Sequence, residues 1–384
     1  MQPPRSAPPA RTTLTDVNLP LRPELAGIEP YGAPQLDVPV LLNVNENPYP
    51  PPAEVVADIA EAVAGAARGL NRYPDRDFEA LRADLAGYLA KESGADELRV
   101  PNIWAANGSN EVMLHLLQAF GGPGRTALSF APTYSMYPEY ARDTLTEYVA
   151  GDREADFSLS ADAALRTIRQ VRPAVVLLAS PNNPTGTALD LATIDQIAAG
   201  TTDTGPDGAA TVVVIDEAYA EFRRTGTPSA LSIRPRYPHL AVARTMSKAF
   251  AGAGIRLGYL AADPAVVDAL RVVRLPYHLS AITQAVARAA LRHTAALQAQ
   301  VSELRTRRDE TVTWLRDQGY QVADSDANFV LFGVFHDRRH IWQGLLDRGV
   351  LIRETGPAGY LRVSIGTAQE MAAFRGALKE VTAA

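Results

Sequence analysis

A chain of 384 residues with 47% hydrophobic and 21% charged side chains has the composition of a globular protein and can bury a large core. Its formal net charge of −6, with both signs interspersed, argues against the basic surface that neutralises nucleic-acid phosphates, so we expect no nucleic-acid partner. The absence of cysteine excludes disulfides, thiolate metal sites and cysteine nucleophiles.

Residues 1–15 are rich in proline and lack the apolar centre of a secretory signal, so we expect a disordered tail there. No uninterrupted apolar run reaches the about 18 residues that span a bilayer. These features predict a cytoplasmic protein that does not associate with a membrane.

From about residue 100, short apolar runs alternate with amphipathic helical stretches such as 110–120 and 189–199. The runs are continuously apolar, which is typical of strands covered on both faces in a largely parallel sheet. The alternation predicts an α/β domain. The expected strands are 126–130, 174–180, 211–217, 240–245 and 257–262.

Beyond about residue 265 the pattern changes. A long helical region at roughly 280–318 precedes three further apolar runs, at 327–334, 349–354 and 360–365, which together predict a smaller α+β domain. We therefore expect four parts: the tail at 1–15, an N-terminal segment at 16–45 associated with the small domain, a large domain at 46–275 and the small domain at 276–384. His336 and His340 have a metal-like spacing, but they stand among charged residues typical of a solvated surface, so we expect no metal site.

Polar residues follow several expected strands, at the sheet edge where α/β proteins bind ligands. The turn PNNPTG at 181–186 holds Asn182 or Asn183 just past a strand end, although these residues are also ordinary turn formers. Asp216 and Glu217 end a strand whose preceding four residues carry no charge. A buried carboxylate needs a partner, and the alternative is a helix N-cap.

The stretch NGSNEV at 107–112 opens an amphipathic helix. Gly108, Ser109 and Asn110 suit an anion held by backbone N–H groups at a helix N-terminus. A simple cap is equally compatible with these residues.

Lys248 is unusual in this chain. Of the 37 Lys and Arg residues only three are lysines, yet one lies among small and apolar residues in RTMSKAFAGAGIRLGY at 244–259. A desolvated lysine amine can lose its proton and attack a carbonyl, whereas the guanidinium of arginine cannot. With the hydroxyls of Thr245 and Ser247 and with Arg256 nearby, the stretch suits an aldehyde cofactor that carries a phosphate. That description fits pyridoxal 5′-phosphate (PLP).

The other polar signals suit the same cofactor. Its pyridine nitrogen needs a carboxylate to stay protonated, which Asp216 can supply. Its ring hydroxyl needs donors, which Asn183 and Tyr219 can supply, and Tyr134 offers an aromatic ring to stack on its face.

With these residues, the sequence resembles the fold-type I, aspartate-aminotransferase-like PLP enzymes and, within them, the histidinol-phosphate aminotransferases. The resemblance runs over nearly the whole chain after the tail. The motifs that carry it are LLNVNENPYPPP at 41–52, NRYPD at 71–75, ANGSNE at 106–111, SPNNPTG at 180–186, DEAY at 216–219, TMSKAF at 245–250 and LRVSIG at 361–366.

The resemblance implies a role for each matching residue. Lys248 would form the Schiff base with the cofactor, Asp216 would pair with its pyridine nitrogen, and Tyr219 would complete the catalytic set. Tyr73 would reach the cofactor phosphate of a neighbouring subunit, which implies a homodimer. The cofactor-binding residues would be Ser109, Asn110, Tyr134, Asn183, Asp216, Tyr219, Thr245, Ser247, Lys248, Arg256 and Tyr73.

On the substrate side, Arg362 matches the family arginine that grips the substrate, with Arg353, Tyr31 and Asn45 assisting. Two arginines and a phenol suit a phosphate monoester as well as a carboxylate. The segment between the two arginines looks shorter than in many relatives.

The implied reaction is a ping-pong transamination. It converts L-histidinol phosphate and 2-oxoglutarate into imidazole-acetol phosphate and L-glutamate, a step of histidine biosynthesis. The alternatives are an aromatic amino-acid aminotransferase, a threonine-phosphate decarboxylase and a non-catalytic protein that keeps the PLP fold.

Overall fold

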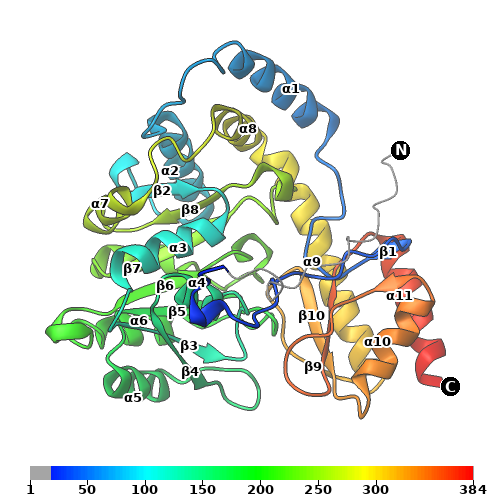
Figure 1. Ribbon diagram of the computed structural model, residues 1–384. Helices are drawn as coiled ribbons and strands as arrows, with labels where there is room; N and C mark the ends of the chain where they lie inside the picture. The colour runs from blue at the N-terminus through cyan, green and yellow to red at the C-terminus, as the bar shows by residue number, and fades with distance from the viewer. Residues whose placement is uncertain (1–18, 384) are drawn as a thin grey trace.

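A seven-stranded sheet forms the centre of the larger part of the protein (Figure 1). The computed structural model describes residues 19–383, so the tail expected at 1–15 lies outside the described residues. The strands follow the spatial order β2 (Ile103–Ala106), β8 (Gly258–Ala261), β7 (Leu240–Thr245), β6 (Val212–Asp216), β5 (Val175–Ala179), β3 (Thr126–Ala131) and β4 (Glu147–Asp152).

The sheet is mostly parallel, as predicted. Strands β7, β6, β5, β3 and β4 run parallel to one another, and β8 is antiparallel to both of its neighbours. Every residue of β5, β6 and β7 is buried, because both faces of the sheet centre are covered. The continuous apolar runs therefore identified these strands correctly.

Two strands of this sheet were not predicted. β2 has four residues, and its neighbourhood lacks a longer apolar run. β4 lies at the edge of the sheet, carries charges at both ends and is largely half-buried or exposed, so its sequence does not show the pattern of a covered strand.

Seven helices accompany the large sheet within residues 19–383. The expected helices at 110–120 and 189–199 are present as α3 and α6. The helices are α1 (Ala53–Ala67), α2 (Glu79–Ser93), α3 (Ser109–Phe120), α4 (Tyr137–Asp143), α5 (Ala161–Val171), α6 (Leu191–Ala199) and α7 (Pro264–Val273).

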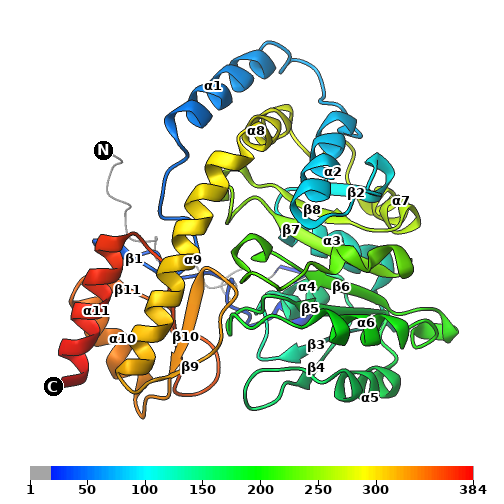
Figure 2. The ribbon, with the colours of Figure 1, turned by 180° about the vertical axis from the view of Figure 1, so that it is seen from behind.

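The C-terminal part lies beside the sheet, in yellow to red in Figures 1 and 2. It contains an antiparallel sheet with the order β12-β10-β9. The elements are α8 (Ala281–Arg292), α9 (Thr294–Asp317), β9 (Gln321–Val322), β10 (Phe329–Gly333), α10 (Arg338–Asp347), β11 (Val350–Leu351), β12 (Leu361–Ser364) and α11 (Ala368–Ala383).

The helical region expected at 280–318 is two helices rather than one. α8 ends at Arg292 because His293 leaves helical backbone angles, and the hydroxyl of Thr294 donates to the carbonyl of Leu291 over 2.7 Å. α8 packs against α1 and α2, whereas α9 runs along β9 and β10. The expected division of the chain at residues 275 and 276 stays a prediction.

The N-terminal segment is joined to the C-terminal part by backbone bonds. β1 (Val40–Leu41) pairs in parallel with β11, and Ser364 N donates to the carbonyl of Leu42 over 2.9 Å. Residues 43–46, which follow β1, are thereby held near the carboxyl ends of β5, β6 and β7. None of the described helices is both long and apolar enough to cross a membrane.

Candidate active site

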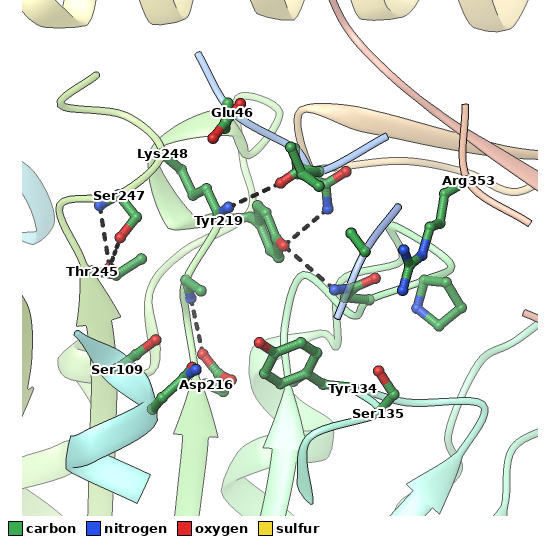
Figure 3. Close-up of a pocket in the computed structure, with 18 of the residues that line it drawn as sticks. Glu46, Ser109, Tyr134, Ser135, Asp216, Tyr219, Thr245, Ser247, Lys248 and Arg353 are labelled. Carbon is green, nitrogen blue, oxygen red and sulfur yellow. Dashed lines mark hydrogen bonds between the residues drawn. The ribbon is translucent and has the colours of Figure 1, made fainter. Parts of the chain in front are cut away.

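A cavity of about 350 Å³ lies where the carboxyl ends of β5, β6 and β7 meet the segment after β1 and strand β12 (Figure 3). Most of the residues selected from the sequence line it: Tyr31, Asn45, Ser109, Asn110, Tyr134, Asn183, Asp216, Tyr219, Thr245, Ser247, Lys248, Arg256, Arg353 and Arg362. Tyr73 is the exception, because its side chain is 80% exposed outside this cavity.

Lys248 follows β7 and reaches into the cavity, as Figure 3 shows. Its Nζ donates to the carbonyl of Val44 over 3.3 Å. Burial and, to a smaller extent, the positive charge of Arg362 lower the pKa of Lys248 to about 8, and the negative charge of Glu46 opposes this change. The amine can therefore lose its proton near neutral pH. Only this uncharged form acts as a nucleophile or a base.

Asp216 is the last residue of β6, and its carboxylate is held by two donors. The hydroxyl of Tyr137 donates to Oδ2 over 3.0 Å, and the backbone N–H of Ala218 donates to Oδ1 over 3.2 Å. Burial raises the pKa of Asp216 to about 6. At neutral pH the side chain is an ionised, buried carboxylate beside the cavity, which is the group that a protonated ring nitrogen needs.

Glu217, the neighbour of Asp216, lies outside the cavity lining. Its Oε2 is 2.8 Å from Nη2 of Arg244, and Ser229 Oγ donates to the same oxygen over 2.7 Å. Successive side chains at a strand end point to opposite sides, so the two carboxylates serve different surroundings. The sequence predicts that Asp216 and Glu217 lie at the end of a strand, but it does not show which of the two carboxylates faces the cavity.

The turn after β5 separates its two asparagines in the same way. Asn182 is buried and donates to the carbonyl of Pro132 over 2.9 Å and to Thr185 Oγ1 over 2.8 Å, so it holds the turn together. Asn183 lines the cavity, and its Oδ1 accepts from Nη1 of Arg362 over 2.6 Å.

Tyr219 presents its hydroxyl to two amides at the centre of the site. Nδ2 of Asn45 lies 3.1 Å from this oxygen and Nδ2 of Asn183 lies 3.5 Å from it. Burial raises the pKa of Tyr219, so the phenol is neutral and has its own proton to donate. Tyr134 borders the cavity near Asp216 in Figure 3, with its ring edge-to-face on Tyr137 at 5.6 Å.

The N-terminus of α3 is open to an anion. Gly108, which precedes the helix, has φ +86, and a Cβ there would lie 2.6 Å from Nη2 of Arg256. Glycine therefore lets the guanidinium approach the first N–H groups of the helix. Thr245 Oγ1 and Ser247 Oγ, which are 3.0 Å apart, also line the cavity. N–H groups, a cation and hydroxyls make a cradle that fits the phosphate of PLP.

A second pair of cations borders the other side of the cavity. Arg353 and Arg362 are joined through their backbones by two hydrogen bonds of 3.0 Å each. Nη2 of Arg362 donates to the carbonyl of Asn43 over 2.9 Å. Within residues 19–383, Nε of Arg362 and Nη1 of Arg353 are buried without a hydrogen-bond partner. Unpaired guanidinium donors at a cavity wall are suited to a bound carboxylate or phosphate.

Several residues of the site were not predicted from the sequence. Asn43 and Glu46 line the cavity and stand within the motif at 41–52, so a signal was present. Tyr137 lies 79 positions from Asp216 in sequence, and no local pattern links the two. Ser135, whose Oγ is 3.0 Å from the hydroxyl of Tyr31, is likewise a contact that only the fold creates. In the described part of the chain, no group of three or more His, Asp or Glu side chains is placed to hold a metal ion.

The chain is similar to known aminotransferases over most of its length. The family described as aminotransferase class I and II matches residues 38–378. The histidinol-phosphate aminotransferase of Thermobifida fusca is 60% identical over 365 residues, which are 95% of this chain and 96% of the relative. Histidinol-phosphate aminotransferase 3 of Burkholderia lata is 59% identical over 366 residues, with shares of 95% and 96%.

A solved structure supports the fold. Histidinol-phosphate aminotransferase from Sinorhizobium meliloti in complex with pyridoxal-5′-phosphate matches with a TM-score of 0.81 at 22% identity. The match covers 96% of this chain and 98% of that one.

Proposed function

Because this chain belongs to the class I and II aminotransferases, we propose that it transfers the amino group of L-histidinol phosphate to 2-oxoglutarate. The products are imidazole-acetol phosphate and L-glutamate, and the reaction is a step of histidine biosynthesis. The enzyme is a PLP-dependent transaminase.

One observation carries the proposal: the cavity that Lys248 lines is also lined by two separate groups of side chains suited to anions, one with Arg256 and one with Arg353 and Arg362. The cradle formed by Arg256 and the N-terminus of α3 fits the cofactor phosphate. The unpaired donors of Arg353 and Arg362 remain for the substrate. Because a guanidinium pairs with phosphate and with carboxylate in similar geometry, this second site suits histidinol phosphate in one half-reaction and glutamate or 2-oxoglutarate in the other.

When bound, PLP supplies an aldehyde that takes up the amino group and a ring that withdraws electrons from the reacting carbon. Lys248 would hold the cofactor through Nζ, and its neutral amine would take the proton from the reacting carbon of the substrate and return it during transfer. Its lowered pKa makes the neutral amine available for this task. Asp216, ionised above about pH 6, would keep the ring nitrogen protonated.

The remaining residues orient the reactants. Asn183 and Tyr219 would donate to the ring hydroxyl, and Tyr134 would offer its ring to the cofactor. The hydrogen bond from Arg362 to Asn183 ties the substrate site to the cofactor site. Tyr31 and Asn45 assist the arginines at the substrate.

We also propose that the protein works as a homodimer in the cytoplasm, with Tyr73 of each chain reaching the cofactor phosphate of the other. Exposed apolar side chains support a partner surface. Leu70 and Tyr73 between α1 and α2 are 57% and 80% exposed, and Val272 and Leu275 at the end of α7 are 84% and 76% exposed.

Absorbance of the bound cofactor tests the proposed reaction. Histidinol phosphate alone should convert the absorbance of the lysine-bound cofactor to that of the amine form, and 2-oxoglutarate should restore it. An unchanged spectrum at millimolar histidinol phosphate would refute the proposed substrate.

A further inference from the structure

Tyr73 is exposed, yet its ring has a defined neighbour. The rings of Tyr73 and Tyr277 are stacked, with centroids 4.5 Å apart and an interplanar angle of 15°. Tyr73 is 80% exposed and Tyr277 is 40% exposed, so the pair stands on the surface outside the cavity of its own chain. Stacking restricts the directions in which the Tyr73 hydroxyl can point.

The two segments that carry these rings are fastened to each other at further points. Asp77 Oδ1 accepts from Nη2 of Arg274 over 3.0 Å. Nε2 of Gln284 donates to the carbonyl of Asp75 over 3.1 Å. The part of the α1–α2 connection just after Tyr73 is therefore fastened to residues on either side of Tyr277, Arg274 and Gln284, which keeps Tyr73 close to Tyr277.

Tyr277 is itself held in an unfavourable backbone conformation. Its φ is +57, a left-handed value that non-glycine residues rarely adopt and that the surroundings must maintain. The next residue, His278, supplies these restraints. Its Nε2 lies 2.9 Å from the carbonyl of Ala105, and its own carbonyl accepts from Nδ2 of Asn107 over 2.9 Å. Both partners lie just before α3, whose N-terminus borders the cavity.

We propose that Tyr277 is a positioning residue that holds the ring of Tyr73 so that its hydroxyl is presented to the cofactor phosphate in the partner subunit. The inference rests on the proposed homodimer. It assigns Tyr277 to the active site of the other chain, where it acts through Tyr73. Removing the ring should therefore impair the partner's site and leave the site of its own chain intact.

Mixed dimers show whether loss of the Tyr277 ring impairs the active site of the partner chain or that of its own chain. The first pairs a Lys248→Ala chain with a Tyr277→Ala chain, so the site that retains Lys248 receives Tyr73 from a chain with Tyr277 intact. The second pairs a wild-type chain with a Lys248→Ala/Tyr277→Ala chain, so the site that retains Lys248 receives an unsupported Tyr73. Two different affinity tags allow each mixed dimer to be purified, and titration with PLP at the absorbance that depends on Lys248 gives its affinity.

We expect wild-type affinity for PLP in the first mixed dimer. In the second, affinity should be roughly two- to tenfold weaker, which is the range of a lost aromatic pair. Replacing Tyr277→Ala by Tyr277→Phe should restore the second mixed dimer, because phenylalanine keeps the stack. The proposal would be overturned if the first mixed dimer bound PLP more weakly than the second, or if both bound it equally well. It would also be overturned if Tyr277→Phe failed to restore binding, or if Tyr277→Ala prevented the dimer from forming.

Tyr73→Ala in the same two pairings distinguishes failure of this inference from failure of the proposed dimer. If Tyr73→Ala weakens PLP binding only in the partner's site and Tyr277→Ala does not, the role of Tyr277 is refuted alone. If Tyr73→Ala has no effect on the partner's site, the proposed contribution across the dimer fails, and the role of Tyr277 fails with it.

Discussion

The hydroxyl of Tyr137 donates a hydrogen bond of 3.0 Å to Oδ2 of Asp216, and both side chains are buried. The contact fixes the carboxylate at the end of β6 and leaves it facing the cavity. A hydrogen bond to the ionised form of a carboxyl group lowers its pKa, so Tyr137 opposes the effect of burial on Asp216.

Tyr137→Phe should therefore raise the pKa of Asp216 above about 6. Because the protonated ring nitrogen of PLP pairs with the ionised carboxylate, affinity for PLP should fall most near pH 6–7 and recover at higher pH. Loss of a hydrogen bond to a charged group predicts roughly tenfold weaker binding at pH 6.5. Titrations between pH 5.5 and 8.5 test this, and a profile equal to that of the wild type would contradict it.

Asp216→Asn should stabilise the cofactor-free protein while abolishing turnover. The pKa of Asp216 is about 6 in the folded chain against 3.8 for the free group, so the folded state holds its proton more tightly. Stability is therefore lost as pH rises from about 4 to 6, by at most about 3 kcal/mol. Asparagine carries no charge and avoids this loss.

Urea unfolding of the cofactor-free proteins at two pH values tests that expectation. At pH 8 the free energy of unfolding of the Asp216→Asn variant should exceed that of the wild type by on the order of 1–3 kcal/mol. At pH 4 the difference should disappear, because Asp216 is protonated there. An equal difference at both values would mean that titration of Asp216 is not the cause.

Lys248→Arg should keep the fold and lose nearly all activity, because a guanidinium neither becomes neutral nor attacks an aldehyde. In the wild-type protein, covalent capture of PLP should accelerate as pH rises through about 8, since the neutral amine is the reactive form. Lys91→Arg is the matched control, because Lys91 is exposed on α2. Wild-type turnover in Lys248→Arg would remove Lys248 from the mechanism.

Gly108→Ala should weaken PLP binding by about tenfold or more. The new Cβ would lie 2.6 Å from Nη2 of Arg256, and φ of +86 is strained for alanine, so both the guanidinium and the start of α3 must shift. Gly254→Ala is the control, since a Cβ there meets no atom within 4 Å. Equal affinities for PLP in the two variants would show that the close approach at Gly108 does not matter.

The sequence predicted the sheet centre and most of the cavity because both rest on local patterns. Strands β5, β6 and β7 each begin with a run of at least four apolar residues, Asp216 ends β6, and Asn183 and Lys248 follow β5 and β7 within a few residues. Contacts between distant segments leave no such pattern. The bond from Tyr137 to Asp216 and the stacking of Tyr73 on Tyr277 are examples, since each joins residues whose proximity the folded chain alone creates.

The most direct test compares substrates in the purified protein. With 2-oxoglutarate as acceptor, kcat/KM for glutamate formation should be at least about a hundredfold higher from histidinol phosphate than from phenylalanine or tyrosine, since its phosphate brings a charge of about −1.5 to −2 to Arg353 and Arg362, where these amino acids bring a singly charged carboxylate. Equal or faster turnover of the aromatic amino acids would contradict the proposed function in favour of an aromatic aminotransferase.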